Sequence, residues 1–123
     1  MENIINNFYE GFEGEVEIQF VQISNNGDKN IISIWNGYFD DIMAKVEPRF
    51  GEWTGLAHFY HSTENFLETE DWEIADKNLA YEQLKELEKN DFKFEETKEV
   101  LKSLCTLLAE AIEKGYIVKI KED

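Results

Sequence analysis

The side chains with the clearest capacity for chemistry are two histidines, His58 and His61. Their separation of three residues places both on one side of a helix, where they could bind a metal ion together with Glu52 or Glu64. The chain has no third histidine and only one cysteine, and the spacing differs from the His-Glu-x-x-His pattern of zinc proteases. We therefore expect no metal site and no other cofactor, and we expect one histidine to pack against an aromatic ring.

Adjacent carboxylates are the second candidates for catalysis. Asp40 with Asp41, and Glu70 with Asp71, could act as acid and base in the way that glycosidases use paired carboxylates. Among 27 acidic residues, however, such pairs occur by chance. The chain also lacks a glycine-rich phosphate loop and the Gly-x-Ser-x-Gly motif of esterases. We predict a binding protein without enzymatic activity, and a small enzyme is the weaker alternative.

The charge of the chain indicates what kind of partner it binds. Twenty-seven acidic residues and 12 lysines and arginines give a net charge of −15, which is spread through both halves of the sequence. This charge repels phosphate backbones and anionic membranes, so direct binding to nucleic acid or to a membrane is disfavoured. A basic protein is a suitable partner, although an acidic surface also serves solubility alone.

The length and composition predict one acidic globular domain over residues 1–123. Hydrophobic residues make up 42% of the chain, which is enough to drive collapse. The lone cysteine, Cys105, excludes an internal disulfide and is typical of a reducing compartment. The N-terminal residues lack the basic and long apolar segments of a signal peptide or a membrane span. We therefore expect a cytoplasmic protein.

Residues 50–76 combine aromatic side chains with dense negative charge. The segment holds two of the three tryptophans, and six acids and no base lie between Glu64 and Asp76. Rigid aromatic side chains provide contact area at protein interfaces, and carboxylates attract a cationic partner. The segment is therefore the predicted contact surface, with a second patch on residues 40 and 41. The predicted partner-binding residues are Asp40, Asp41, Glu64, Glu68, Glu70, Asp71, Trp72 and Glu73.

The spacing of the apolar residues changes within the first 23 residues, which predicts a helix followed by a strand. Apolar residues over 3–12 recur at helical spacing, which predicts a short amphipathic helix. Over 15–23, apolar and polar residues alternate, as in a half-exposed strand. Asn26-Gly27 follows, and this pair favours a type I′ hairpin turn with a return strand over 29–35.

Residues 28–47 have two interpretations. Their apolar residues fit one long helix without a gap, which would make the fold mainly α. In the interpretation that we favour, the strand over 29–35 pairs with the preceding strand, and a helix over 37–47 follows and ends before Pro48.

The remaining sequence predicts mainly helices. Asp76 or Asn78 would cap a helix over 77–89, and Gly115 would end a helix that begins near 95. The predicted fold is therefore α+β, a helix-rich single domain with an N-terminal β-hairpin and a C-terminal strand. The elements are a helix over 53–60, an irregular loop over 63–73, a helix over 77–89, a helix that begins near 95, and a strand over 116–121.

A pattern of glycines and aromatic residues runs through residues 37–87. It consists of Gly37-Tyr38-Phe39, then Gly51-Glu52-Trp53-Thr54-Gly55-Leu56-Ala57-His58-Phe59-Tyr60-His61, then Trp72-Glu73-Ile74-Ala75-Asp76. With this pattern the chain resembles the immunity proteins of bacterial contact-dependent growth inhibition systems. The resemblance implies a small cytoplasmic protein that binds a cognate toxin domain, commonly a basic nuclease. Binding faces diverge among such proteins, so no contact residue is carried over.

This implication agrees with the charge of the chain. A nuclease toxin presents a positive groove to a phosphate backbone, and an acidic protein with aromatic anchors can occupy that groove. Two alternatives stay open at this point. One is an acidic regulatory or adaptor domain that binds another basic protein. The other is a nucleic-acid mimic, whose carboxylates would compete with nucleic acid for a DNA-binding enzyme.

Overall fold

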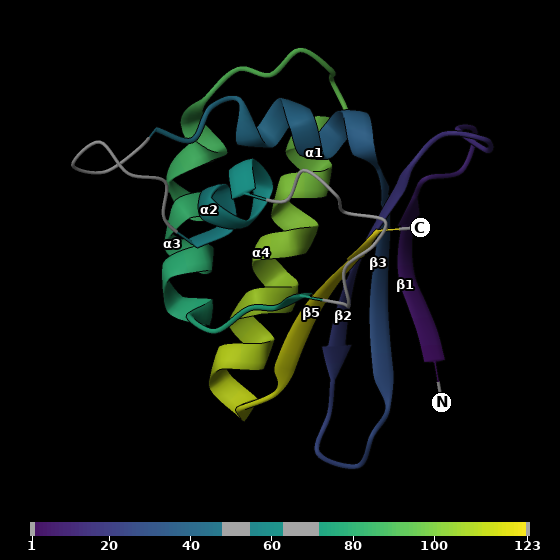
Figure 1. The fold of residues 1–123 in the computed structure, drawn as a ribbon, viewed down its shortest axis with the longest axis vertical. Helices are drawn as coiled ribbons and strands as arrows, with labels where there is room; N and C mark the ends of the chain where they lie inside the picture. Colours follow the sequence, from purple (N-terminus) through teal and green to yellow (C-terminus); the bar gives the residue numbers. More distant parts are fainter. Residues whose placement is uncertain (1, 48–54, 63–71, 123) are drawn as a thin grey trace.

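The computed structural model of the chain describes residues 2–47, 55–62 and 72–122 (Figure 1). These residues form an α+β fold, as predicted from the sequence. In chain order the elements are β1 (Glu2–Phe8), β2 (Glu17–Ile23), β3 (Lys29–Trp35), α1 (Asn36–Met43), α2 (Gly55–Ser62), β4 (Trp72–Glu73), α3 (Lys77–Glu86) with a 3-10 turn (Leu87–Lys89), α4 (Thr97–Lys114) and β5 (Ile117–Glu122).

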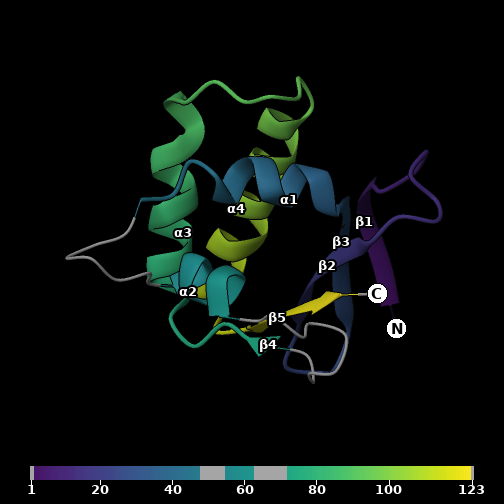
Figure 2. The ribbon, with the colours of Figure 1, turned by 45° about the horizontal axis from the view of Figure 1, so that its top comes forward.

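The five strands form one sheet in the order β1-β3-β2-β5-β4. β1 runs parallel to β3, and the other neighbouring strands are antiparallel. The helices lie on one side of the sheet, with α4 next to the strands and α3 beside α4 (Figure 1, Figure 2). The predicted C-terminal strand is therefore an interior strand, and β1 and β4 are the two edges.

A cluster of buried side chains fills the space between the sheet and the helices. The strands contribute alternate residues and the helices contribute residues three and four positions apart, which are the periods that place side chains on one face. Elements from β2 to β5 share this cluster, so the described residues fold around one core. Its largest fully buried members are Phe20, Phe39, Ile32, Ile34, Ile42, Met43, Leu56, Leu84, Leu101, Leu104, Leu108 and Ile120.

The predicted hairpin is present, but its turn differs from the predicted type. The Gly27 amide donates to the Ser24 carbonyl at 3.0 Å, and the Ser24 amide donates to the Asp28 carbonyl at 2.9 Å. These bonds close a three-residue loop in which Gly27 comes last, with φ 88°. A type I′ turn centred on Asn26 and Gly27 would instead join the Asp28 amide to Asn25. The glycine supplies the left-handed residue that the three-residue loop requires.

The long helix over 28–47 is excluded, because residues 29–35 form β3. All seven residues of β3 pair with β2, and this pairing decides between the strand and helix patterns. The following helix, α1, ends at Met43, four residues before the predicted end. Lys45 and Val46 then donate to carbonyls three residues earlier, which tightens the chain after the last turn.

The predicted helix over 3–12 is wrong, because residues 2–8 form β1. Ile4 is 61% exposed and Ile5 is 50% exposed, so two residues that an amphipathic helix would bury lie at the surface. β1 pairs with residues 29–34 of β3, with a one-residue shift at Ile5. Hydrogen bonds between such distant segments override the local helical period.

The predictions for α3 and α4 are confirmed in their main features. The Asp76 carboxylate accepts a hydrogen bond from the Leu79 amide at 3.0 Å, so Asp76 is the cap of α3. Gly115 ends α4 in the left-handed conformation, with φ 72°. The predicted loop over 63–73 is corrected at its end, where Trp72 and Glu73 form β4. The buried stripe of α4 comprises Val100, Leu101, Leu104, Cys105, Leu107, Leu108 and Ala111.

Candidate protein-binding surface

Two acidic residues and one tyrosine, carried by α1, α2 and β5, interact with one another. The Tyr60 hydroxyl on α2 donates a hydrogen bond of 2.9 Å to the Asp40 carboxylate on α1. Burial raises the pKa of Tyr60 to about 12, and the hydrogen bond to Asp40 and its negative charge add to this effect. Tyr60 is therefore a neutral donor at physiological pH that fixes the position of the Asp40 carboxylate.

The packing of α1 and α2 explains why Tyr60 reaches Asp40. On α1, Phe39 and Ile42 are buried, which leaves Asp40 on the exposed side of the helix. The ring of Phe39 packs edge-on against the ring of Tyr60, with centroids 5.6 Å apart and an interplanar angle of 77°. The aromatic contact holds the tyrosine ring, so its hydroxyl lies at the surface beside the carboxylate.

The position of α2 depends on Gln83, a buried residue of α3. Its side-chain oxygen accepts a hydrogen bond from the Leu56 amide at 3.0 Å, which satisfies a free donor in the first turn of α2. Gly55 begins this turn with φ 57°, and a Cβ at this position would lie 2.5 Å from the Gln83 oxygen. The backbone of α2 therefore approaches Gln83 as closely as only a glycine allows.

Glu122, at the end of β5, is the second carboxylate of the site. It pairs with Ile18 of β2, and it has the same parity as Val118 and Ile120, which face the helices. Burial raises the pKa of Glu122, and the negative charge of Asp40 raises it further. The two carboxylates therefore repel each other. Among the described residues, no ion pair includes either of them.

Trp72 on β4 lies close to this carboxylate pair. It is opposite Ile120, two residues along β5 from Glu122, which corresponds to about 7 Å of strand. Trp72 is half-buried and packs against the core. We call Asp40, Tyr60, Trp72 and Glu122 the acidic surface. A cation placed between its two carboxylates would relieve their repulsion, and the aromatic rings would provide apolar contact.

Asp41 does not belong to this surface, although it is adjacent to Asp40 in sequence. Its side chain is 8% exposed and accepts hydrogen bonds from the Lys93 and Phe94 amides, each at 3.0 Å, and from the Thr97 hydroxyl at 2.7 Å. Burial alone would raise the pKa of Asp41, but these three bonds outweigh it and lower the pKa. Asp41 therefore holds α1 against the start of α4 and is unavailable to a partner.

The other predicted contact residues have different locations. Glu73 is exposed on β4, but it alternates with Trp72 and faces the other side of the sheet, opposite Lys119. The acidic residues Glu64, Glu68, Glu70 and Asp71 lie outside the described residues. Of the predicted set, Asp40 interacts with Tyr60 and Glu122, and Trp72 lies on the strand next to the one that carries Glu122.

Sequence reasoning missed two members of the acidic surface. The helical pattern over 53–60 places Tyr60 on the inner face of its helix, and its hydroxyl gives no separate signal. The orientation of Glu122 could have been predicted from the alternation of side chains along the final strand. Positions 118 and 120 face the core, so position 122 faces the same side.

The candidate metal site of the sequence analysis falls on side chains outside the described part of the structure, because His58 and His61 belong to α2 but only its backbone is described at these positions. Among the side chains that the structure does describe, no three histidines, cysteines, aspartates or glutamates form a group that could hold a metal ion. No helix within residues 2–47, 55–62 and 72–122 is long and apolar enough to cross a membrane.

Comparisons with known proteins give no relative on which to base a function. The chain matches no protein-family model, no curated protein and no solved structure.

Proposed function

We propose that this chain is an immunity protein that binds a cognate basic toxin domain in the cytoplasm and blocks the groove where the toxin, a nuclease, binds nucleic acid. The observation that supports this function best is the acidic surface. Its carboxylates, Asp40 and Glu122, repel each other and take part in no ion pair within the described residues. They belong to a chain of net charge −15.

The mechanism follows from the chemistry of the toxin. A nuclease groove carries lysines and arginines that bind phosphates, and these side chains are attracted to the acidic protein from a distance. At contact, an arginine guanidinium between Asp40 and Glu122 would make charge-assisted hydrogen bonds. Tyr60 holds the Asp40 carboxylate in place, so less side-chain freedom is lost on binding. The occupied groove can no longer bind nucleic acid.

Co-expression with a toxin domain tests the function directly. The chain is expressed with the toxin domain encoded immediately upstream of its gene, and host growth and copurification are measured. We expect growth to be restored and a 1:1 complex to elute. If the chain neither protects the host nor binds the domain, the immunity function is excluded. Equal binding to unrelated basic proteins would instead support the regulatory or adaptor alternative.

Charge-neutral substitutions test the acidic surface. In the double variant Asp40→Asn and Glu122→Gln, both charges are removed, while the amide oxygen of the substituted side chain at position 40 can still accept the hydrogen bond from Tyr60. We expect the dissociation constant for the toxin to rise at least about tenfold and the salt dependence of the association rate to become weaker.

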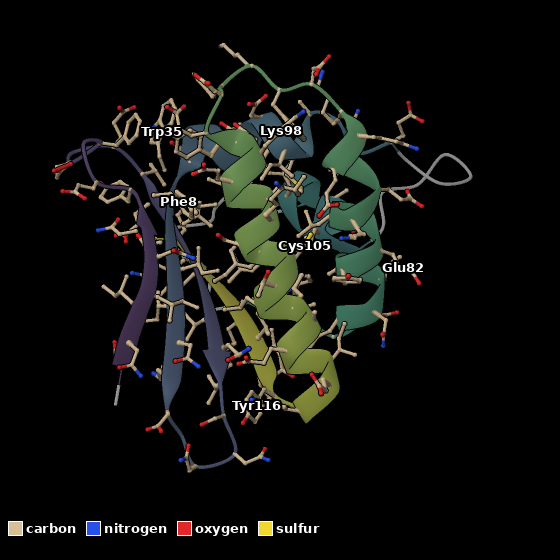
Figure 3. The ribbon with its side chains drawn as sticks, turned by 180° about the vertical axis from the view of Figure 1, so that it is seen from behind. Phe8, Trp35, Glu82, Lys98, Cys105 and Tyr116 are labelled. Carbon is tan, nitrogen blue, oxygen red and sulfur yellow. The ribbon has the colours of Figure 1, made fainter. Side chains whose placement is uncertain are left out.

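The matched control is the double variant Glu82→Gln and Glu113→Gln. It removes the same charge from exposed positions on α3 and α4, and Figure 3 shows Glu82 on the outer side of α3. We expect a change of less than about twofold in affinity. Equal effects of the two double variants would place the contact elsewhere. The triple variant Glu68→Ser, Glu70→Ser and Asp71→Ser would then test the segment before β4.

A further inference from the structure

β1 is an edge strand with features that set it apart from the rest of the surface. It follows β3 at the end of the sheet order, and no strand pairs with its outer side in the described part of the chain. Ile4 and Ile5 have the highest exposure of the large hydrophobic residues described, at 61% and 50%. An open edge offers unpaired amide and carbonyl groups to another strand.

Most of β1 lacks the residues that usually block such an edge. Natural edge strands avoid pairing through prolines, lysines, inward-pointing charges or β-bulges. From Asn3 to Phe8 the strand has no proline and no charged residue. The one-residue shift at Ile5 bends the pairing with β3, but it places no charge on the outer side.

Helix α4 also makes contact with β1. The Asn6 side chain donates a hydrogen bond of 3.2 Å to the Ser103 hydroxyl of α4. Ile5, Asn6, Lys102 and Thr106 line a shallow groove of about 220 Å³ between β1 and α4. Figure 1 shows β1 alongside β3 at the side of the molecule away from α3. The strand is therefore held in an extended conformation before any partner binds.

We propose that β1 is the interface of a homodimer, in which the β1 strands of two copies pair antiparallel and join their sheets into one. The uncharged sequence of the strand favours a second copy as the occupant, because two antiparallel copies of residues 3–8 place no like charges opposite each other. Two molecules of net charge −15 repel each other over most of their surfaces, and the uncharged segment from Asn3 to Phe8 is a strip where they can approach. A basic partner would gain no charge pairing from this neutral strip.

Two-fold symmetry also suits the sequence of the strand. A pairing centred on Ile4 places Glu2 opposite Asn6 of the second copy, and a pairing centred on Ile5 places Glu2 opposite Phe8. In both registers the glutamates of the two copies lie at opposite ends. In each register one exposed isoleucine lies opposite the same residue of the second copy, so contact between the two apolar side chains adds to the new hydrogen bonds.

Sedimentation velocity of the full chain at low and high sodium chloride tests the homodimer. We expect a species of twice the 14.5 kDa chain mass, and we expect added salt to increase its population, because salt screens the repulsion between the copies. A chain that stays monomeric at both salt concentrations would overturn the proposal. The edge would then be free for a strand of another protein.

Paired variants locate the interface. Ile4→Glu adds a carboxylate to β1, and Ile117→Glu adds the same charge at a 41% exposed isoleucine on β5, which is not adjacent to β1 in the sheet. We expect Ile4→Glu to raise the dimer dissociation constant at least about tenfold, and Ile117→Glu to raise it less than about threefold. Equal effects would exclude β1 as the interface. Circular dichroism confirms that both variants are folded, and protection from the toxin remains a separate readout.

Discussion

At the scale of single residues, Asp40 and Asp41 show how two identical neighbours acquire different roles. Successive residues of a helix point about 100° apart, so one carboxylate of such a pair faces outward when the other faces a neighbouring element. Asp40 is exposed beside Tyr60, whereas Asp41 is buried and bonded to the segment that precedes α4. The sequence marks both as acidic, and only the position of residues 93–97 distinguishes them.

The first stability prediction concerns Asp41→Asn. The amide group cannot accept hydrogen bonds at both of its ends, so at least one of the Lys93, Phe94 and Thr97 donors loses its partner. We expect the free energy of unfolding at pH 7 to fall by about 2–3 kcal/mol, as measured by urea denaturation. Asp40→Asn is the control and should change it by less than about 0.5 kcal/mol. Similar losses in both variants would contradict the role of Asp41.

The same residue predicts a pH dependence. The pKa of Asp41 in the folded chain lies below the ordinary value of 3.8, so the folded state favours the ionised carboxylate. Its contribution to stability is complete above pH 3.8 and is lost as the pH falls through the lowered pKa. The difference in unfolding free energy between the natural chain and Asp41→Asn should therefore narrow in acid. A difference that stays constant as the pH falls well below 3.8 would rule this out.

At the scale of elements, α2 depends on a close approach that the sequence does not reveal. Gly55→Ala would place a Cβ 2.5 Å from the Gln83 oxygen in a left-handed conformation. We expect a loss of about 2–4 kcal/mol in unfolding free energy. Gly115→Ala, with φ 72° and no atom within 4 Å of the added Cβ, isolates the backbone cost and should lose about 1 kcal/mol. A larger loss for Gly115→Ala would disprove the steric explanation.

The elements also show what sequence periodicity can predict. α3, α4 and the hairpin are predicted well, because caps, apolar stripes and a glycine turn act between residues close in sequence. The sequence predicts a helix where β1 lies, because the strand character of β1 comes from β3, which is distant along the chain. The acidic surface is predicted in part, because Asp40 has a local pattern while its proximity to Tyr60 and Glu122 depends on three separate elements.

At the scale of the whole molecule, the two proposed interfaces lie apart. β1 is one edge of the sheet, and Glu122 and Trp72 of the acidic surface lie on β5 and β4, toward the other end of the strand order. In a dimer formed through β1, the strands β3 and β2 would separate the new interface from Glu122.

This separation predicts opposite responses to salt. Binding of a basic toxin should weaken as sodium chloride rises, because screening reduces attraction between opposite charges. Self-association should strengthen over the same range, because screening reduces repulsion between copies. Calorimetry with the toxin and sedimentation of the chain alone measure the two responses. If both change in the same direction with salt, one of the two interfaces is assigned to the wrong surface.

β5 lies between β2 and β4 in the sheet although it comes last in the chain, so the sheet is completed late in synthesis. A ribosome delivers the chain from its N-terminus, so β1, the hairpin and the helices α1 to α4 emerge before β5. β4 pairs with β5, and Glu122 lies on β5, so neither the second edge of the sheet nor the carboxylate pair can form earlier. Under the proposed function, a nascent chain that lacks β5 would give no protection, so a cell would depend on molecules completed before the toxin arrives.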